Sequence, residues 1–424
     1  MGKKLAILGG KPILNKPFDP VYNISKKEIE SLIKLLGKGP LSDFVGITGD
    51  KFLGGKQVRK LEFLFCKKFG SRFAVTFNSA TTALQAAVAS LEIGPGDEVI
   101  VPPYTMSASA TSILANGAVP VFADIDEDNF CVDPTSIEKV ISSRTKAIMI
   151  VNLFGNPADF DQILKIAKKY KLKTIEDNAQ APGAQYKGKY TGTIADVGVF
   201  SFNVHKVIQI GEGGVLVTNN KHSAYRAQLV RNHGEIVADE DPNYHLGPVM
   251  GNNFRMSEIH ALLGYYQLKK LDFLNEKRLD LVNHLRSKLA DIEGFILPKE
   301  DKDKKHVYYV FPIKIDENKL GISRNLFVEA MAAEGFPMSK GYVKPIYLLK
   351  LFQEKHVFNQ THFPFDYDGY NTNYDRGLCP VTERLYEKEL TFTDICQHPR
   401  TYRQIDLFFD AVNKVLQCKL ELLE

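Results

Sequence analysis

The sequence predicts an α/β fold: a large domain built on a mostly parallel, seven-stranded sheet with helices on both faces, and a smaller C-terminal α+β domain. Between about residues 56 and 265, short apolar runs alternate with helical stretches. Runs that are apolar throughout are typical of parallel strands buried on both faces. After about residue 265 the composition becomes more charged, and 424 residues exceed one ordinary core. These observations divide the chain into more than one domain.

The first 55 residues are turn-rich and predict an N-terminal arm that lies across another surface of the protein. One helix is expected in this arm, from an N-cap at Ser25 through Leu35. Residues 56–265 form the predicted large domain, and residues 266–424 form the small one.

Within the large domain, a helix is expected over residues 58–69, ending at Gly70, and another over residues 81–91. The predicted strands cover residues 73–77, 98–101, 119–123, 147–151, 173–175, 197–202 and 215–218. For the small domain the sequence predicts a helix over 268–289, a half-buried strand over 306–315, a helix over 324–333, a long loop over 358–376 and a helix over 401–420.

Charge and composition exclude several classes of protein. A net charge of +4, with Lys and Arg spread along the chain, predicts no nucleic-acid partner. No apolar run is long enough for a membrane span, and the first residues lack the apolar stretch of a signal peptide. The five cysteines have no metal-type spacing, so we expect reduced thiols, no metal site and a cytoplasmic location.

Polar residues follow three of the predicted strands, at the sheet edge where α/β proteins bind ligands. Residues 78–81 open a helix with small and hydroxylated side chains, Asp177 follows the strand at 173–175, and Lys206 follows the strand at 197–202. Taken singly, these are a helix cap, a turn carboxylate and a solvated lysine. Together they supply what pyridoxal phosphate needs: an amine for a Schiff base, a carboxylate for the pyridine nitrogen, and a helix N-terminus for the phosphate.

The stretch from Ser201 to Gly214, with the sequence SFNVHKVIQIGEGG, resembles the lysine loop of the DegT-type sugar aminotransferases. That family belongs to the fold-type I enzymes that depend on pyridoxal phosphate. Further resemblances follow in the family's order and cover nearly the whole chain. They lie at residues 94–102, 175–183, 231–234, 251–256 and 379–385.

The resemblance implies a role for each matching residue. Lys206 would form the Schiff base and move protons, Asp177 would pair with the pyridine N–H, and Gln180 would lie against the ring. The phosphate would be bound by Ala80, Thr81 and Ser201. Asn253 would reach the phosphate of a neighbouring subunit, which predicts a homodimer with shared active sites. Met106 occupies the position that covers the ring.

The sequence departs from the family pattern in three places. Ala80 replaces the usual glycine of the phosphate turn, which keeps a backbone N–H but adds a Cβ. Met106 replaces the usual aromatic ring, and either its thioether or a neighbouring aromatic such as Tyr104 would cover the cofactor. Segments 41–55 and 355–375 are longer than the family norm and lie where substrate is expected to enter.

The implied reaction moves an amino group from an amino acid, expected to be L-glutamate, to a keto-sugar, with pyridoxamine phosphate as the intermediate cofactor form. The sugar is expected to be nucleotide-linked, and the pathway to make amino sugars for surface polysaccharides or secondary metabolites. A free or phosphorylated sugar or an inositol ketone is the alternative acceptor.

Three other functions are weighed against this one. Dehydratases of the family carry His at the Schiff-base position, whereas Lys206 is five residues after Ser201 and five before Gly211, as in the aminotransferases. A dinucleotide-dependent oxidoreductase needs glycines after the first strand, and residues 78–82 contain none. A non-catalytic sensor would not need Lys206, Asp177 and Gln180 together.

Overall fold

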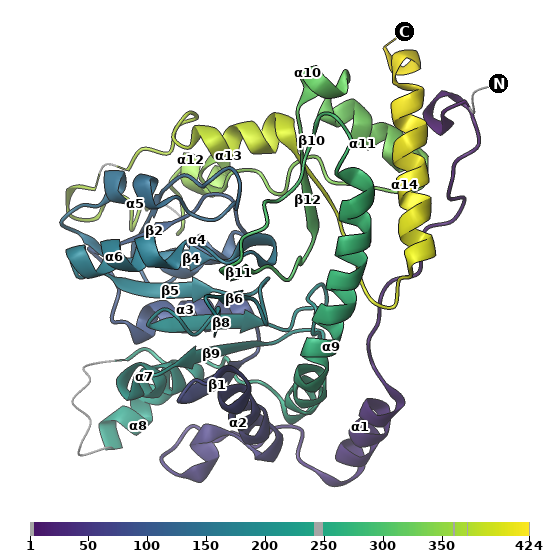
Figure 1. The fold of residues 1–424 in the computed structure, drawn as a ribbon. Coiled ribbons are helices and arrows are strands. Elements are labelled where there is room, and N and C mark those ends of the chain that lie inside the picture. The colour runs from purple at the N-terminus through teal and green to yellow at the C-terminus, as the bar shows by residue number, and fades with distance from the viewer. Residues whose placement is uncertain (1–3, 241–248, 359–360, 371, 424) are drawn as a thin grey trace.

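The structure, a computed structural model, describes residues 4–240, 249–358, 361–370 and 372–423 (Figure 1). Its large sheet has the strand order β1-β9-β8-β5-β4-β2-β3. Strand β9 is antiparallel to both neighbours, and the other pairs are parallel. The predicted mostly parallel, seven-stranded sheet is therefore confirmed. Its strands are β1 (Phe73–Phe77), β2 (Glu98–Val101), β3 (Val119–Phe122), β4 (Thr145–Val151), β5 (Lys173–Asp177), β8 (Val197–Ser201) and β9 (Gly214–Thr218).

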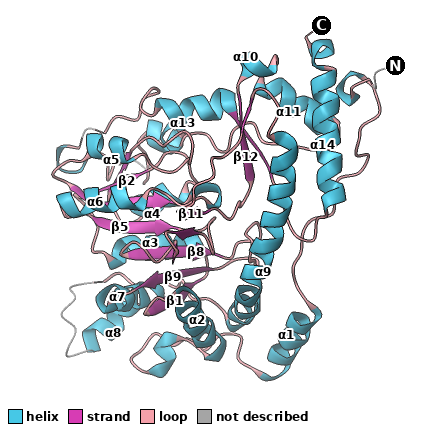
Figure 2. Cartoon of the chain, viewed as in Figure 1, coloured by secondary structure: helices cyan, strands magenta, loops and turns pink. Residues whose placement is uncertain are grey.

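Helices cover both faces of this sheet (Figure 2). Successive side chains of a strand point to opposite faces, so Val99 and Val101 enter one apolar cluster while Ile100 enters another. One face is covered by α3 (Ala80–Ser90), α4 (Ala108–Leu114) and α7 (Lys221–Arg231), which α8 (Gly234–Glu240) follows. The other face is covered by α2 (Lys56–Phe69), α5 (Pro134–Val140), α6 (Phe160–Tyr170) and the first half of α9 (Glu258–Leu289).

The C-terminal part has a core of its own, formed by a three-stranded antiparallel sheet, two helices and the second half of α9. The sheet consists of β10 (Phe295–Ile296), β12 (Phe311–Ile315) and β13 (Leu390–Thr393), and the helices are α11 (Arg324–Ala333) and α14 (Tyr402–Gln417). Shorter helices are α10 (Glu317–Leu320), α12 (Lys350–Gln353) and α13 (Pro380–Arg384). A third small sheet joins the two parts of the chain through β6 (Gln185–Tyr186), β7 (Lys189–Tyr190) and β11 (Lys304–Lys305).

The N-terminal segment contacts both cores. Leu5 is fully buried in the C-terminal core. Helix α1 (Lys26–Lys38) begins after Ser25, which forms a capping box with Glu28, and the helix extends three residues beyond its predicted end. Glu28 also accepts a hydrogen bond from Gln267 of α9 at 2.7 Å. The arm is thereby tied to the long helix that joins the two cores.

Two predicted elements differ from the structure. The half-buried strand expected over residues 306–315 is wrong in its first half: the strand begins at Phe311 and is buried throughout. Residues 306–310 instead contact the turn around Phe154, with hydrogen bonds from Val307 and Tyr309. The long helix begins at Glu258 and not at 268, so the predicted boundary between 265 and 266 falls inside α9. The domain limits stay a prediction.

Within the described ranges, none of the helices combines the length and the apolar character that crossing a bilayer requires.

Candidate active site

The strand ends that carry the predicted site residues meet at one edge of the large sheet. Strand β5 ends with Asp177, β8 ends with Ser201, and β1 leads directly into the turn before Ala80. Because β1, β5 and β8 run in the same direction, their carboxyl ends lie on the same side. The structure thus brings together the segments that the sequence predicts to act together.

Gly214 brings the start of α3 against the sheet. It pairs with Ser201 across β8 and β9, and a Cβ at this position would lie 2.6 Å from the backbone nitrogen of Ala80. The first turn of α3 carries no acidic residue. Among the described residues, the N–H groups of Ala80 and Thr81 have no hydrogen-bond partner. A helix N-terminus of this kind suits a phosphate group.

Asp177 is a buried carboxylate with too few partners for its charge. Ser109 Oγ donates to Oδ2 at 2.8 Å, and the N–H of Ala179 donates to Oδ1 at 3.1 Å. Burial nevertheless raises the pKa of Asp177, because desolvation outweighs these hydrogen bonds and the attraction of Lys206. A cationic group placed beside this carboxylate, such as a protonated pyridine, would favour its ionised form.

Lys206 lies in the turn after β8, close enough to Asp177 to feel its charge. Burial lowers the pKa of Lys206 to about 8, and the Asp177 carboxylate acts in the opposite direction. Nζ lies 4.6 Å from the centre of the Tyr309 ring, a cation–π distance. An amine whose pKa lies near physiological pH is suited to both nucleophilic attack and proton transfer.

Gln180 is held in place from both ends. Its Oε1 accepts a hydrogen bond from the backbone N–H of Phe154 at 2.8 Å, and its Nε2 donates to the hydroxyl of Tyr342 at 2.7 Å. The backbone N–H of Tyr342 in turn donates to the hydroxyl of Tyr104 at 2.8 Å. This chain of contacts fixes the amide beside Asp177 and links it to the C-terminal part of the protein.

Met106 and Asn253 lie at the surface, whereas Tyr104 does not. Met106 precedes α4 and is 57% exposed, so its thioether is free to cover a bound ring. Tyr104 is fully buried, with its ring 5.9 Å from that of Tyr342. Asn253 is exposed and forms an isolated bridge with Asn232. The roles of these residues in binding a cofactor stay predictions.

Three residues beside this site have no local sequence signal. Ser109 reaches Asp177 from α4, while Tyr309 and Tyr342 reach Lys206 and Gln180 from the C-terminal part. Each is far from its partner along the chain, so no spacing rule would find them. Within the part of the chain that the structure describes, no cluster of side chains is suited to hold a metal ion.

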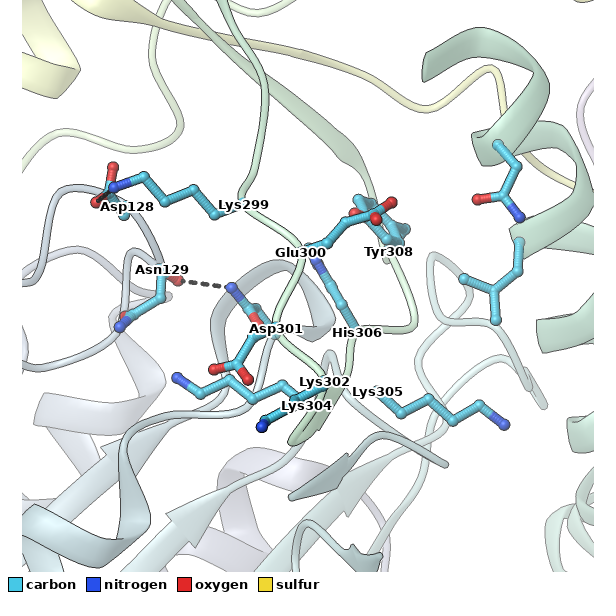
Figure 3. Close-up of a pocket in the computed structure, with 13 residues that line it drawn as sticks. Asp128, Asn129, Lys299, Glu300, Asp301, Lys302, Lys304, Lys305, His306 and Tyr308 are labelled. Carbon is cyan, nitrogen blue, oxygen red and sulfur yellow. Dashed lines mark hydrogen bonds and ion pairs between the residues drawn. The ribbon is translucent and has the colours of Figure 1, made fainter. Parts of the chain in front are cut away.

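A separate cavity of about 660 Å³ is lined mainly by residues 299–308 together with Asp128 and Asn129 (Figure 3). His306, which lines it, hydrogen-bonds to the carbonyl of Phe154 at 3.1 Å, and burial lowers the pKa of His306 to about 3. Lys299 extends across this cavity to Asp128 at 2.6 Å (Figure 3). None of the predicted site residues lines the cavity, so it is distinct from the site around Lys206.

Comparison with known proteins places the chain among the aminotransferases. Residues 46–389 match the DegT/DnrJ/EryC1/StrS aminotransferase family. GDP-perosamine synthase of Caulobacter vibrioides is 36% identical over 297 residues, which cover 70% of this chain and 78% of that protein. A protein of Streptoalloteichus tenebrarius, assigned as an L-glutamine:3-amino-2,3-dideoxy-scyllo-inosose aminotransferase, is 33% identical over 98% of each chain.

The fold is also similar to those of solved structures. The crystal structure of DesI in the presence of its TDP-sugar product superposes with a TM-score of 0.81 and 27% sequence identity. The superposition covers 99% of this chain and 98% of that one. The similarity therefore extends over both parts of the protein and includes the segments that surround Lys206.

Proposed function

The chain belongs to the DegT/DnrJ/EryC1/StrS aminotransferase family, and we propose that it transfers the amino group of L-glutamate to a nucleotide-linked keto-sugar. It is a sugar aminotransferase with a fold-type I architecture, a transferase of the EC 2.6.1 type whose family depends on pyridoxal phosphate. The observation that carries the proposal is that the buried groups Lys206 and Asp177 act electrostatically on one another at the carboxyl edge of the sheet.

The residues present fit pyridoxal phosphate. Asp177 lacks a full counter-charge, Gly214 leaves room between Ser201 and the start of α3, and Lys206 supplies an amine close to neutrality. When bound, the cofactor supplies an aldehyde for the amine and an electron sink for the bond broken at carbon. We assign Ala80, Thr81 and Ser201 to the phosphate and Gln180 to the ring.

Proton transfer falls to Lys206 in both halves of the reaction. Its Nζ takes the proton from the α-carbon of the amino donor, and later places a proton on the sugar carbon that receives the amine. Tyr309 holds Nζ against one face of the site, which limits the directions from which the proton arrives. The configuration of the new amine follows from that direction.

A nucleotide-linked acceptor is supported by two of the similar proteins. One is named GDP-perosamine synthase, and the other was solved with a TDP-sugar product. The second candidate is amination of an inositol ketone with L-glutamine as donor. It is supported by the relative that matches 98% of the chain and is assigned to an aminated inosose.

Half-reactions of the purified protein test the proposal. The protein is first converted to its pyridoxamine form, and candidate keto-sugars are added one at a time. Return of the aldehyde absorbance with a GDP-, TDP- or UDP-linked keto-sugar is the expected result. Return with an inositol ketone alone would favour the second candidate, and elimination of water from the sugar without amine transfer would contradict both.

Conversion to the pyridoxamine form identifies the donor. L-Glutamate and L-glutamine are each added to the aldehyde form, and loss of its absorbance is followed. We expect the faster conversion with L-glutamate, whereas faster conversion with L-glutamine would support the relative assigned to that donor.

A further inference from the structure

Two buried hydroxyl groups lie in a row beside the Asp177 carboxylate. Ser109, in the first turn of α4, donates from Oγ to Oδ2 of Asp177 at 2.8 Å. The Oγ1 atom of Thr105 lies 3.1 Å from the same Ser109 oxygen. Both Ser109 and Thr105 are buried, so bulk water does not compete for these hydrogen bonds. The row Thr105–Ser109–Asp177 is therefore a part of the structure that is shielded from solvent.

The carboxylate determines the direction of both hydrogen bonds. An ionised carboxylate accepts hydrogen bonds and has no proton to donate. The single proton of the Ser109 hydroxyl is therefore directed to Asp177, so Thr105 donates to Ser109 and not the reverse. Hydrogen bonds that run in one direction polarise and strengthen one another. Together the two hydroxyl groups favour the charged form of Asp177.

Ser109 opposes the effect of burial on Asp177. Burial raises the pKa of Asp177, and the hydrogen bond from Ser109 acts most strongly among the contacts that lower it. The N–H of Ala179 and the charge of Lys206 contribute less. The charge of Lys206 is also lost above its pKa of about 8, whereas the Ser109 hydroxyl keeps its proton there. Ser109 is thus the contact that supports the carboxylate over the widest range of pH.

We propose that Ser109, oriented by Thr105, is a positioning residue that keeps Asp177 ionised for the pyridine nitrogen of the cofactor. The inference rests on the proposed function, in which Asp177 pairs with that nitrogen. Ser109 acts through Asp177: its hydroxyl holds the carboxylate in place and favours its negative charge before the cofactor binds. A ring that arrives with a protonated nitrogen then meets a counter-ion that is already charged and oriented.

A merely structural role in α4 is the alternative for Ser109. Ser112 has that role: it is buried on the same helix, and its Oγ donates to the backbone carbonyl of Ser109 at 3.0 Å. Among the described residues, no hydrogen bond joins Ser112 to Asp177. Ser112→Ala therefore removes a buried hydroxyl from α4 without removing a donor to the carboxylate, and it is the matched control for Ser109→Ala.

Binding of two cofactor forms to the cofactor-free protein tests the inference. One is pyridoxal phosphate, and the other is its 1-deaza analogue, in which carbon replaces the pyridine nitrogen and no N–H meets the carboxylate. We expect Ser109→Ala to weaken the binding of pyridoxal phosphate by roughly 10- to 100-fold and to change the binding of the analogue by less than about threefold. Thr105→Val should weaken pyridoxal phosphate less, and Ser112→Ala should bind both forms like the wild type. Equal weakening of both forms by Ser109→Ala would overturn the inference, because it indicates a structural role.

The pH dependence of binding gives a second measurement. Affinity for pyridoxal phosphate should fall as the pH drops through the pKa of Asp177, because a protonated carboxyl group no longer attracts the ring cation. Loss of the Ser109 donor raises that pKa further, so in Ser109→Ala the fall should begin at higher pH. Ser109→Thr keeps a hydroxyl group and should restore the wild-type profile. A profile that Ser109→Ala leaves unmoved would contradict the proposed role.

The wild type separates this inference from the proposed function. If it binds pyridoxal phosphate and the 1-deaza analogue equally well, the pairing of Asp177 with the pyridine nitrogen fails, and the inference fails with it. If the wild type prefers pyridoxal phosphate and Ser109→Ala retains the same preference, the role of Asp177 stands and the inference alone is defeated.

Discussion

Lys206 and Asp177 perturb one another across the candidate site. Burial pushes each toward its neutral form, and the attraction between them opposes that shift. The pKa of the Lys206 amine is therefore lowered to about 8, and the pKa of the Asp177 carboxyl group is raised from its ordinary value. A cofactor that bonds to the amine and places a cation beside the carboxylate relieves both costs at once.

Replacement of Lys206 by Ala should abolish the covalent attachment of the cofactor. The wild type is expected to be yellow and to give a lysine adduct after borohydride reduction, because Nζ is the amine beside Asp177. In Lys206→Ala both signals should vanish, which absorbance and peptide mass spectrometry measure. A reducible adduct that persists on another lysine of the variant would contradict the assignment.

Uptake of pyridoxal phosphate by the cofactor-free protein should depend on pH. Attack requires the neutral amine, and the pKa of Lys206 is lowered from 10.5 to about 8. The rate should therefore rise with pH through about 8 and level off above that value, as followed by the absorbance of the product. Asp177 favours the ammonium form, so in Asp177→Asn the rise should move to lower pH. A rise centred near 10.5 would show that burial does not act on this amine.

At the scale of elements, contact between α3 and β9 determines the geometry of the proposed phosphate site. In Gly214→Ala the new Cβ would overlap the backbone before α3, 2.4 Å from the carbonyl oxygen of Ser79. We expect a loss of about 2 kcal/mol or more in the free energy of unfolding, and weaker cofactor binding. Thermal melting and titration with pyridoxal phosphate measure the two effects.

Gly37→Ala is the matched control for that substitution. Gly37 lies inside α1, and a Cβ there meets nothing within 4 Å. Alanine should stabilise the helix by about 0.5–1 kcal/mol and leave cofactor affinity unchanged. Equal melting temperatures for the two variants would mean that the close approach at Gly214 is not rigid.

Elements whose side chains share one environment could be predicted from the sequence, and elements at junctions could not. The apolar runs of β1 and β2 match the structure because each of these strands is buried on both faces. Strand β5 extends two residues past its predicted end, and these two residues are acidic. Glu176, the first of them, is fully buried and accepts hydrogen bonds from the N–H groups of Ile194 and Ala195 at 2.7 and 2.8 Å. The hydrogen bonds that compensate for burying this carboxylate come from distant segments, so no local sequence pattern predicts them.

The candidate site divides in the same way. Asp177 and Ser201 end the neighbouring strands β5 and β8, and Lys206 follows β8, so their positions at and after strand ends were enough to predict that they lie together. Tyr309 comes from the C-terminal part, and its ring lies beside Lys206 only because the two parts of the chain pack together. Residues at the junction of two cores depend on that packing, which no single segment specifies.

At the scale of the whole molecule, the proposed role of Asn253 requires two subunits. Mixing Lys206→Ala with Asn253→Asp should restore activity, because in a mixed dimer one site combines an intact Lys206 with an intact Asn253 from the other chain. Random mixing predicts about a quarter of the wild-type rate. Each variant alone should be nearly inactive, and an inactive mixture with confirmed exchange of subunits would exclude the shared site.

Helix α9 contributes residues to both cores. Its 32 residues span about 48 Å, with its first half against the large sheet and its second half in the C-terminal core. Unfolding of one core would remove the packing that holds its half of α9 and so weaken the other half. We therefore expect the two cores to unfold together, as one endotherm in scanning calorimetry. Because the helix is stiff, we expect any closure around a substrate to rotate one core about the axis of α9 and not to translate it along that axis.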